Sequence, residues 1–172
     1  MEKYDFILKN ECATIDFGVA LSAAIGDTGL CVYLVGDLGA GKTTLSRGIM
    51  RGYGYNGAVK SHTYTIVEPY TLNYKGKPRL VTHFDFYRLN QPSEVEFLGL
   101  ENYFSGSSLC LIEWPNRGKN LIPEPDIKLN LYDFFEIKGA ADVKHYTDQR
   151  SISFEAFSSD GKKILTETKK FL

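Results

Sequence analysis

A segment of eight residues, from Gly36 to Thr43, constrains this chain more than any other part of its sequence. It reads Gly-Asp-Leu-Gly-Ala-Gly-Lys-Thr and satisfies the pattern Gly-x4-Gly-Lys-[Ser/Thr]. The apolar run Leu30–Val35 precedes it and is typical of a strand buried on both faces. A helix is expected to follow, over about 42–51. Because glycines let successive backbone N–H groups point inward, a turn in this position surrounds an anion.

The same loop predicts how a nucleotide is held. The positive end of the helix dipole faces the phosphates, Lys42 neutralises the outer ones, and the Thr43 hydroxyl is placed to ligate Mg²⁺. A chance glycine-rich turn is the alternative, and the flanking strand and helix argue against it. ATP and Mg²⁺ are therefore the expected ligand and cofactor. The residues of the loop predicted to bind the nucleotide are Gly36, Asp37, Leu38, Gly39, Ala40, Gly41, Lys42, Thr43 and Thr44.

The length, the net charge and the cysteines of the chain limit which partners and which compartment it can have. The chain has 172 residues, which fit one compact domain, and its formal net charge of -1 gives no overall attraction to nucleic acid or to an anionic membrane. The three cysteines form no Cys/His ligand pattern and suit a reducing compartment. No apolar leader or 18-residue apolar run occurs. We therefore expect a cytoplasmic protein with no membrane association.

The rest of the pattern predicts a mixed α/β fold. A helix is expected over 14–25 with Thr14 as its N-cap, short helices over 92–104, and an amphipathic segment over 160–172. The strand–loop–helix start followed by later hairpins implies one P-loop domain over 1–172, with helices flanking a mixed, partly antiparallel sheet. Residues 1–139 support this best, and 140–172 form a C-terminal strand and helix extension. The other expected strands cover 4–9, 64–70, 79–86, 109–112, Ile127–Ile137 and 150–157.

Two acids are candidates for the metal side of the site. A P-loop protein places a carboxylate at the end of a neighbouring strand, where it holds the metal or its water shell. Glu113 follows four apolar residues, in the manner of a Walker B segment, and Asp85 comes late in the strand over 79–86. A salt bridge or a helix cap is the alternative for each. Lys42, Asp85 and Glu113 are the predicted catalytic residues, and Thr43, Glu113 and Asp85 the predicted metal ligands.

Other polar and aromatic residues near these segments allow two interpretations. His83 is more often a hydrogen-bonded core histidine than a catalyst. Trp114, the single tryptophan, either fills the core or contacts a nucleotide or partner beside Glu113. Ser61, Thr63 and Thr65 follow the P-loop helix, where P-loop proteins carry a switch-like loop that senses the γ-phosphate. Threonines of an exposed strand are the alternative there.

Several ordered segments resemble the TsaE family, whose older name is YjeE. The resemblance spans about 14–150, most of the chain. The first motif that carries it is the P-loop, followed by Arg47-Gly48. The chain departs from the family at His62, where the family usually has proline. The loss of proline restores a backbone N–H donor and frees the preceding residue. The segments that carry the resemblance are 36–45, 61–70, 83–89, 98–101, 112–115 and 121–123.

The resemblance implies a bacterial ATPase subunit of tRNA modification. Such a subunit acts on a TsaB–TsaD assembly that attaches threonylcarbamoyl to adenosine at position 37 of ANN-decoding tRNAs, using an intermediate made by TsaC. It hydrolyses ATP, weakly when alone, and does not transfer the group itself. The expected partners are thus TsaB-like and TsaD-like proteins, with tRNA reached only through the complex. By the same resemblance, Thr43 and Glu113 would coordinate Mg²⁺, Asp85 would belong to the metal region, and Thr14 and Arg150 would lie near the nucleotide.

Three other functions share the P-loop. A small-molecule or nucleotide kinase would need an acceptor pocket and an arginine-rich lid, whereas the six arginines of this chain form no cluster. A GTPase would carry an Asn-Lys-x-Asp guanine-reading element, which does not occur after the P-loop. A binding module that uses ATP only to hold an assembly together stays open, because a P-loop does not by itself supply an attacking water.

Overall fold

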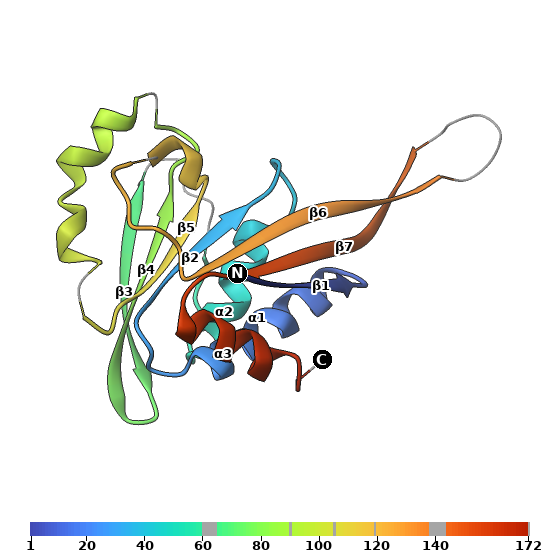
Figure 1. The fold of residues 1–172 in the computed structure, drawn as a ribbon, viewed down its shortest axis with the longest axis horizontal. Coiled ribbons are helices and arrows are strands. Elements are labelled where there is room, and N and C mark those ends of the chain that lie inside the picture. Colours follow the sequence, from blue (N-terminus) through green and yellow to red (C-terminus); the bar gives the residue numbers. More distant parts are fainter. Residues whose placement is uncertain (60–64, 90, 105, 119, 138–143, 172) are drawn as a thin grey trace.

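The protein is built on one seven-stranded mixed sheet in the order β1-β7-β6-β2-β5-β4-β3 (Figure 1). The computed structural model describes residues 1–59, 65–89, 91–104, 106–118, 120–137 and 144–171. The strands are β1 (Glu2–Leu8), β2 (Leu30–Val35), β3 (Val67–Tyr74), β4 (Lys77–Asp85), β5 (Leu109–Glu113), β6 (Ile127–Ile137) and β7 (Lys144–Ala156). The α-helices described are α1 (Glu11–Ile25), α2 (Lys42–Gly52) and α3 (Ser159–Thr168).

The centre of the sheet is parallel and its flanks are antiparallel. Strand β2 pairs in parallel with β5 and β6, and β4 pairs in parallel with β5. Strands β1, β3 and β7 join by antiparallel pairing, so the predicted mixed sheet is confirmed. In open α/β sheets the ligand lies beyond the carboxyl ends of the parallel strands. In this protein, that edge is where β2 leads into the P-loop and where β5 ends at Glu113.

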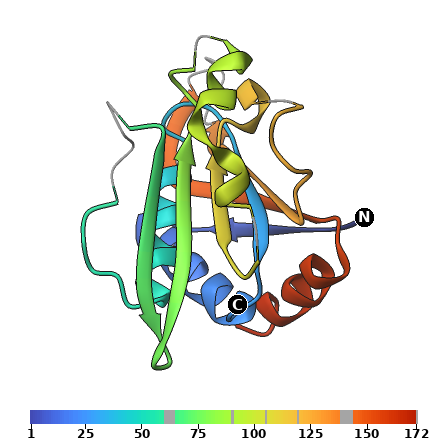
Figure 2. The same cartoon turned by 90° about the vertical axis from the view of Figure 1, so that its left-hand side faces the viewer.

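The two faces of the parallel strands bury different side chains, as period-two alternation requires. On one face, Val32, Leu109 and Leu111 pack with the apolar side of α1 and α2. On the other face, Phe84 and Ile112 pack under the segment after β4. That segment contains the short helices expected over 92–104, and both are of the 3-10 type: η1 (Pro92–Leu98) and η2 (Leu100–Asn102). Figure 2 shows it in front of the sheet, with α2 behind.

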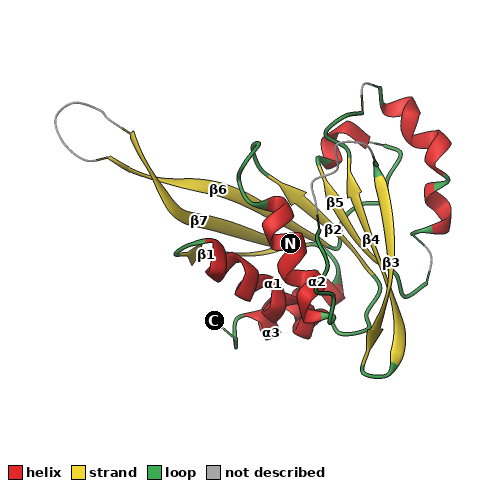
Figure 3. Ribbon diagram, turned by 180° about the vertical axis from the view of Figure 1, so that it is seen from behind, coloured by secondary structure: helices red, strands yellow, loops and turns green. Residues whose placement is uncertain are grey.

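Helices α1 and α2 lie side by side on the sheet (Figure 3). They touch at two glycines: a Cβ on Gly18 would be 2.7 Å from Ile49 N, and one on Gly48 would be 2.5 Å from Ile15 O. Since neither backbone atom can yield, glycine allows the close approach that sets the position of α2 and therefore of the P-loop.

The predicted start of the first helix was wrong by one turn. Asn10 is the N-cap of α1, and its Oδ1 accepts a hydrogen bond of 2.9 Å from Ala13 N. Thr14 lies inside the helix, where its hydroxyl donates to Asn10 O at 3.2 Å. Asparagine is at least as good a cap as threonine, so the earlier residue begins the helix. The strand expected over 150–157 also begins earlier, at Lys144, because β7 pairs along the full length of β6.

A buried arginine joins three parts of the chain at the end of the sheet opposite the P-loop. Arg79 of β4 is 3% exposed, and its guanidinium lies 5.4 Å from the centre of the Tyr53 ring. It donates to Asp27 O at 3.1 Å and to Thr28 O at 2.7 Å, in the turn after α1. It also donates to Ser107 O, just before β5. These contacts connect the turn after α1 to β4 and to the segment before β5.

Candidate nucleotide-binding site

The P-loop runs from Gly36 to Lys42 between β2 and α2, in a conformation that requires glycine. Gly36, Gly39 and Gly41 have φ values of 155°, 86° and 98°, all in the positive range that side chains disfavour. At Gly36 there is also no space, because a Cβ would lie 2.5 Å from Leu131 O on β6. The loop therefore lies directly against β6. Helix α2 begins at Lys42, so the free backbone N–H groups of its first turn lie at the end of the loop.

Lys42 turns back over its own loop. Its side-chain amine donates to Gly36 O at 2.8 Å and to Asp37 O at 2.7 Å, and lies 4.2 Å from the centre of the Trp114 ring. Burial lowers the pKa of Lys42 from its ordinary value, while the carboxylates of Glu113 and Asp85, among others, oppose the shift. The amine is thus a positive charge held by carbonyl oxygens, which phosphate oxygens can replace.

Thr43, Glu113 and His83 meet behind the loop. The Thr43 hydroxyl lies 3.1 Å and 3.3 Å from the two carboxylate oxygens of Glu113, seventy residues away in the chain. His83 Nε2 lies 2.9 Å from Glu113 Oε1. Glu113 is 2% exposed, so its carboxyl group has these two hydrogen-bonding neighbours in place of bulk water. The structure therefore brings together the P-loop threonine and the acid at the end of β5.

Asp85 lies next to Glu113, because the two end adjacent parallel strands in register. It is 6% exposed, and its Oδ1 accepts a hydrogen bond of 3.0 Å from Tyr87 N. The hydroxyl of Thr43 and the carboxylates of Glu113 and Asp85 are hard oxygen donors, which Mg²⁺ prefers. Within the described residues no cluster of three or more His, Cys, Asp or Glu could hold a metal alone. Mg²⁺ at a nucleotide needs fewer protein ligands, since phosphates complete its shell, so this donor set fits it.

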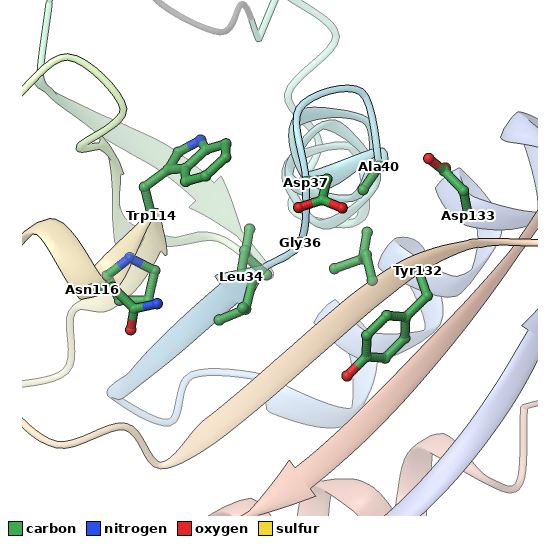
Figure 4. Close-up of a pocket in the computed structure, with 11 residues that line it drawn as sticks. Leu34, Gly36, Asp37, Ala40, Trp114, Asn116, Tyr132 and Asp133 are labelled. Atoms are coloured by element: carbon green, nitrogen blue, oxygen red, sulfur yellow. The ribbon is translucent and has the colours of Figure 1, made fainter.

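A cavity of about 390 Å³ opens beside the P-loop. Its walls come from the loop, from β6 and from the turn after β5, where Trp114 has the unusual φ of 58°. Figure 4 shows Trp114 and Asn116 on one side, Asp37 in the middle, and Tyr132 and Asp133 on the other. A non-glycine residue with positive φ is uncommon and is held there by its surroundings. This backbone turn directs the indole toward Lys42 and the cavity.

Arg150 reaches the loop from β7. A Cβ on Gly41 would lie 2.9 Å from Arg150 Nε, so the arginine side chain rests directly against the start of α2. In the sheet, Arg150 is the register partner of Asp133, which lines the cavity. The residues that sequence reasoning missed here are Asn116, Leu131, Tyr132 and Asp133. An acid inside a mostly apolar strand was the one available signal for Asp133.

The remaining predicted site residues differ in position and burial. Thr14 is fully buried in α1, with its hydroxyl bonded to the backbone. Thr65 is exposed, just before β3, and Ser61 and Thr63 lie outside the described residues. Leu38 is 70% exposed at the tip of the loop, Ala40 is buried, and Thr44 is half-buried in the first turn of α2.

The strand–loop–helix cradle, joined to an acid on the adjacent parallel strand, defines a P-loop protein of the α/β class with an NTPase-like fold. The family model of the threonylcarbamoyl adenosine biosynthesis protein TsaE matches residues 8–138. The chain therefore belongs to the TsaE family, which is involved in tRNA threonylcarbamoyladenosine biosynthesis. Among the described residues, no helix combines the length and the apolar character needed to cross a membrane.

Individual relatives agree with the family model. The chain is 40% identical to the tRNA threonylcarbamoyladenosine biosynthesis protein TsaE of Haemophilus influenzae, over 96% of this chain and 98% of the relative. It is 38% identical to the protein of the same name in Bacillus subtilis, over 79% and 75% of the two chains. The crystal structure of Bacillus subtilis YdiB superposes with a TM-score of 0.69 at 28% identity, covering 98% of this chain and 95% of that one.

Proposed function

We propose that this chain is the Mg²⁺-dependent ATPase subunit of tRNA threonylcarbamoyladenosine synthesis. It hydrolyses ATP to ADP and phosphate in the cytoplasm and acts on a TsaB–TsaD assembly, which transfers the group to position 37 of ANN-decoding tRNAs. The contact between Thr43 and Glu113 carries the proposal, because it joins the P-loop to a carboxylate at the place where a nucleotide-bound metal would lie. The membership of the TsaE family supports the pathway.

Each residue of the site has a distinct role in this proposal. Lys42 leaves the carbonyls of Gly36 and Asp37 and pairs with the outer phosphates, whose charge also opposes the lowering of its pKa. Thr43 and Glu113 hold Mg²⁺, with Asp85 beside them. When bound, the ion neutralises charge on the β- and γ-phosphates.

The cavity beside the loop is proposed to take the rest of the nucleotide. Trp114 and Asn116 on one wall and Tyr132 on the other offer apolar and polar surface for a base and a ribose (Figure 4). Arg150, which rests against Gly41, adds a positive charge at the entry to the helix. The loop that contains Ser61, Thr63 and Thr65 is proposed to sense the γ-phosphate.

The dependence on partners is also part of the proposal. Asp85 and Glu113 are both almost fully buried, and Arg150 is the arginine that the described contacts place against the P-loop. A further charge that stabilises the transition state would come from the assembly, as trans-acting arginines do for other P-loop proteins. The net charge of -1 suits contact with tRNA through the complex rather than directly.

The proposal is tested by measuring ATP turnover with purified TsaB-like and TsaD-like proteins. Turnover is expected to be weak for the chain alone and to rise when both partners are present. The Lys42→Ala variant is expected to lose the stimulation by at least about a hundredfold, because the charge that faces the outer phosphates is gone. Background turnover with the partners present would contradict the ATPase role, and phosphate transfer to a sugar or nucleoside would show a kinase instead.

A further inference from the structure

A buried histidine lies behind the candidate metal site, and the proposed function gives it no role so far. His83 of β4 is 1% exposed, and its Nε2 lies 2.9 Å from Glu113 Oε1. Strand alternation places His83 on the same face of the sheet as Asp85, beside the parallel strand that ends at Glu113. That face is covered by the helix that carries Thr43. The imidazole of His83 and the hydroxyl of Thr43 therefore both contact the Glu113 carboxyl group.

Glu113 has two hydrogen-bonding neighbours of different kinds. One is the Thr43 hydroxyl, which lies 3.1 Å and 3.3 Å from the two oxygens and so prefers neither strongly. Thr43 is itself a proposed ligand, so its contact with Glu113 must change when a cation arrives. The other neighbour is His83, which approaches a single oxygen, Oε1. Only the contact between His83 and Glu113 Oε1 can stay unchanged when the cation binds.

We propose that His83 is a positioning residue, which donates from Nε2–H to Glu113 Oε1 and so presents the other carboxylate oxygen to the metal beside Thr43. The inference rests on the proposed function, because it takes Glu113 to be a Mg²⁺ ligand. A glutamate side chain has several free torsions, and fixing it in advance removes the entropy cost of ordering it at the moment of binding. Groups that orient a metal ligand by hydrogen bonding typically change metal affinity by about 10–100-fold when removed.

A purely structural role makes a different prediction. If His83 only satisfied a buried carboxylate, its loss would lower the stability of the fold and leave the metal affinity of the folded protein unchanged. Metal affinity measured apart from turnover therefore separates the two roles. Mn²⁺ is a suitable stand-in for Mg²⁺, because it binds the same oxygen ligands and is detected by electron paramagnetic resonance.

Four variants form the test. In His83→Gln the amide nitrogen lies the same number of bonds from Cα as the imidazole Nε2, so the donor is restored. In His83→Asn the donor is too short to reach, and in His83→Met it is absent while the volume is kept. Thr82→Val is the matched control, since Thr82 is a buried polar neighbour on the opposite face of β4. Melting temperatures without ligand identify the temperature range in which every variant is folded.

Two titrations are made on each folded variant. Mn²⁺ affinity is measured with ADP bound, and ADP affinity is measured in EDTA from the fluorescence of Trp114, the single tryptophan. His83→Asn and His83→Met are expected to lose about tenfold or more in Mn²⁺ affinity. Their metal-free ADP affinity should stay within about twofold, and His83→Gln should bind Mn²⁺ within about threefold of the wild type. Thr82→Val should match the wild type in both titrations.

Three results would overturn the inference. They are wild-type Mn²⁺ affinity in both donor-less variants, an equal loss in Thr82→Val, or a parallel loss of metal-free ADP affinity. Failure of His83→Gln to recover Mn²⁺ affinity would also count against a positioning hydrogen bond. If the wild-type protein itself bound no Mn²⁺ with ADP, the proposed function would fail first, so the two failures are distinguishable.

Discussion

At Gly36 both the backbone angle and the surroundings require glycine. Its φ of 155° and the Leu131 carbonyl, 2.5 Å from where a Cβ would be, both exclude a side chain. Gly39, three residues later, also has a positive φ of 86°, but its Cβ would meet nothing within 4 Å. A side chain is therefore excluded at Gly36 by both the φ angle and the surrounding atoms, and at Gly39 by the φ angle alone.

The Gly36→Ala variant is expected to lower the free energy of unfolding by about 2–5 kcal/mol, because the clash with β6 adds to the strain of the positive φ. Nucleotide affinity should fall by at least about tenfold, since the N–H groups of the cradle shift together. Gly39→Ala should be milder, at about 1–2 kcal/mol, from left-handed strain alone. Urea denaturation and nucleotide titration measure both effects, and equal effects of the two changes would contradict this account.

At the scale of elements, the parallel strands β2 and β5 place two thiols side by side. Cys31 and Cys110 are register partners and are buried, whereas Cys12 on α1 is exposed. Burial raises the pKa of Cys110 to about 12, and burial also raises the pKa of Cys31. Thiolates are the reactive form of cysteine, so both strand cysteines should be inert in the folded protein.

Ellman's reagent at about pH 8 is therefore expected to modify one thiol quickly in the native protein and all three after denaturation. The pH dependence has a defined sign. The neutral Cys110 thiol favours the folded state fully below its ordinary pKa of 9.0, and that stability is lost as the pH rises from 9.0 toward about 12. Rapid reaction of all three thiols in the native protein at about pH 8 would show that the strand pair opens readily.

The elements that could be predicted from the sequence were those with a local signal. Strand β2 is one continuous apolar run and α2 follows a glycine-rich turn, so both were found nearly to the residue. The start of α1 was wrong, because two cap residues, Asn10 and Thr14, compete one turn apart. The 3-10 conformation of 92–98 was also not predicted, since it depends on packing against the sheet rather than on periodicity.

The site was predictable in its parts but not in its contacts. The P-loop and the two acids each carry a local pattern, and the structure places Thr43, Glu113 and Asp85 at one edge of the sheet. The contact between His83 and Glu113 depends on the register of β4 against β5, which no short segment encodes. The cavity wall from β6 depends in the same way on strand order, so Tyr132 and Asp133 were missed.

At the scale of the whole molecule, Arg79 joins the layers. Its three carbonyl partners lie in the turn after α1 and in the segment before β5, and its own strand is β4. Replacement by leucine would leave those carbonyls without their charged donor. Arg79→Leu is therefore expected to lower the free energy of unfolding by about 3 kcal/mol or more. Arg51→Leu, at an exposed position, should change it by less than about 0.5 kcal/mol.

Chemical denaturation followed by two signals checks this prediction. Far-ultraviolet circular dichroism reports on the backbone, and Trp114 fluorescence reports on the edge of the sheet next to the P-loop. If Arg79 joins the layers of a single cooperative unit, both signals shift together in Arg79→Leu. A variant as stable as the wild type would show that the buried guanidinium is dispensable.

The contact between Arg150 and Gly41 has a mechanical consequence. Strands β6 and β7 run side by side away from the body of the protein (Figure 1), and the near end of this ribbon rests on the phosphate loop. Because Arg150 joins this ribbon to the start of α2, a displacement of β7 would also change the contact at Gly41.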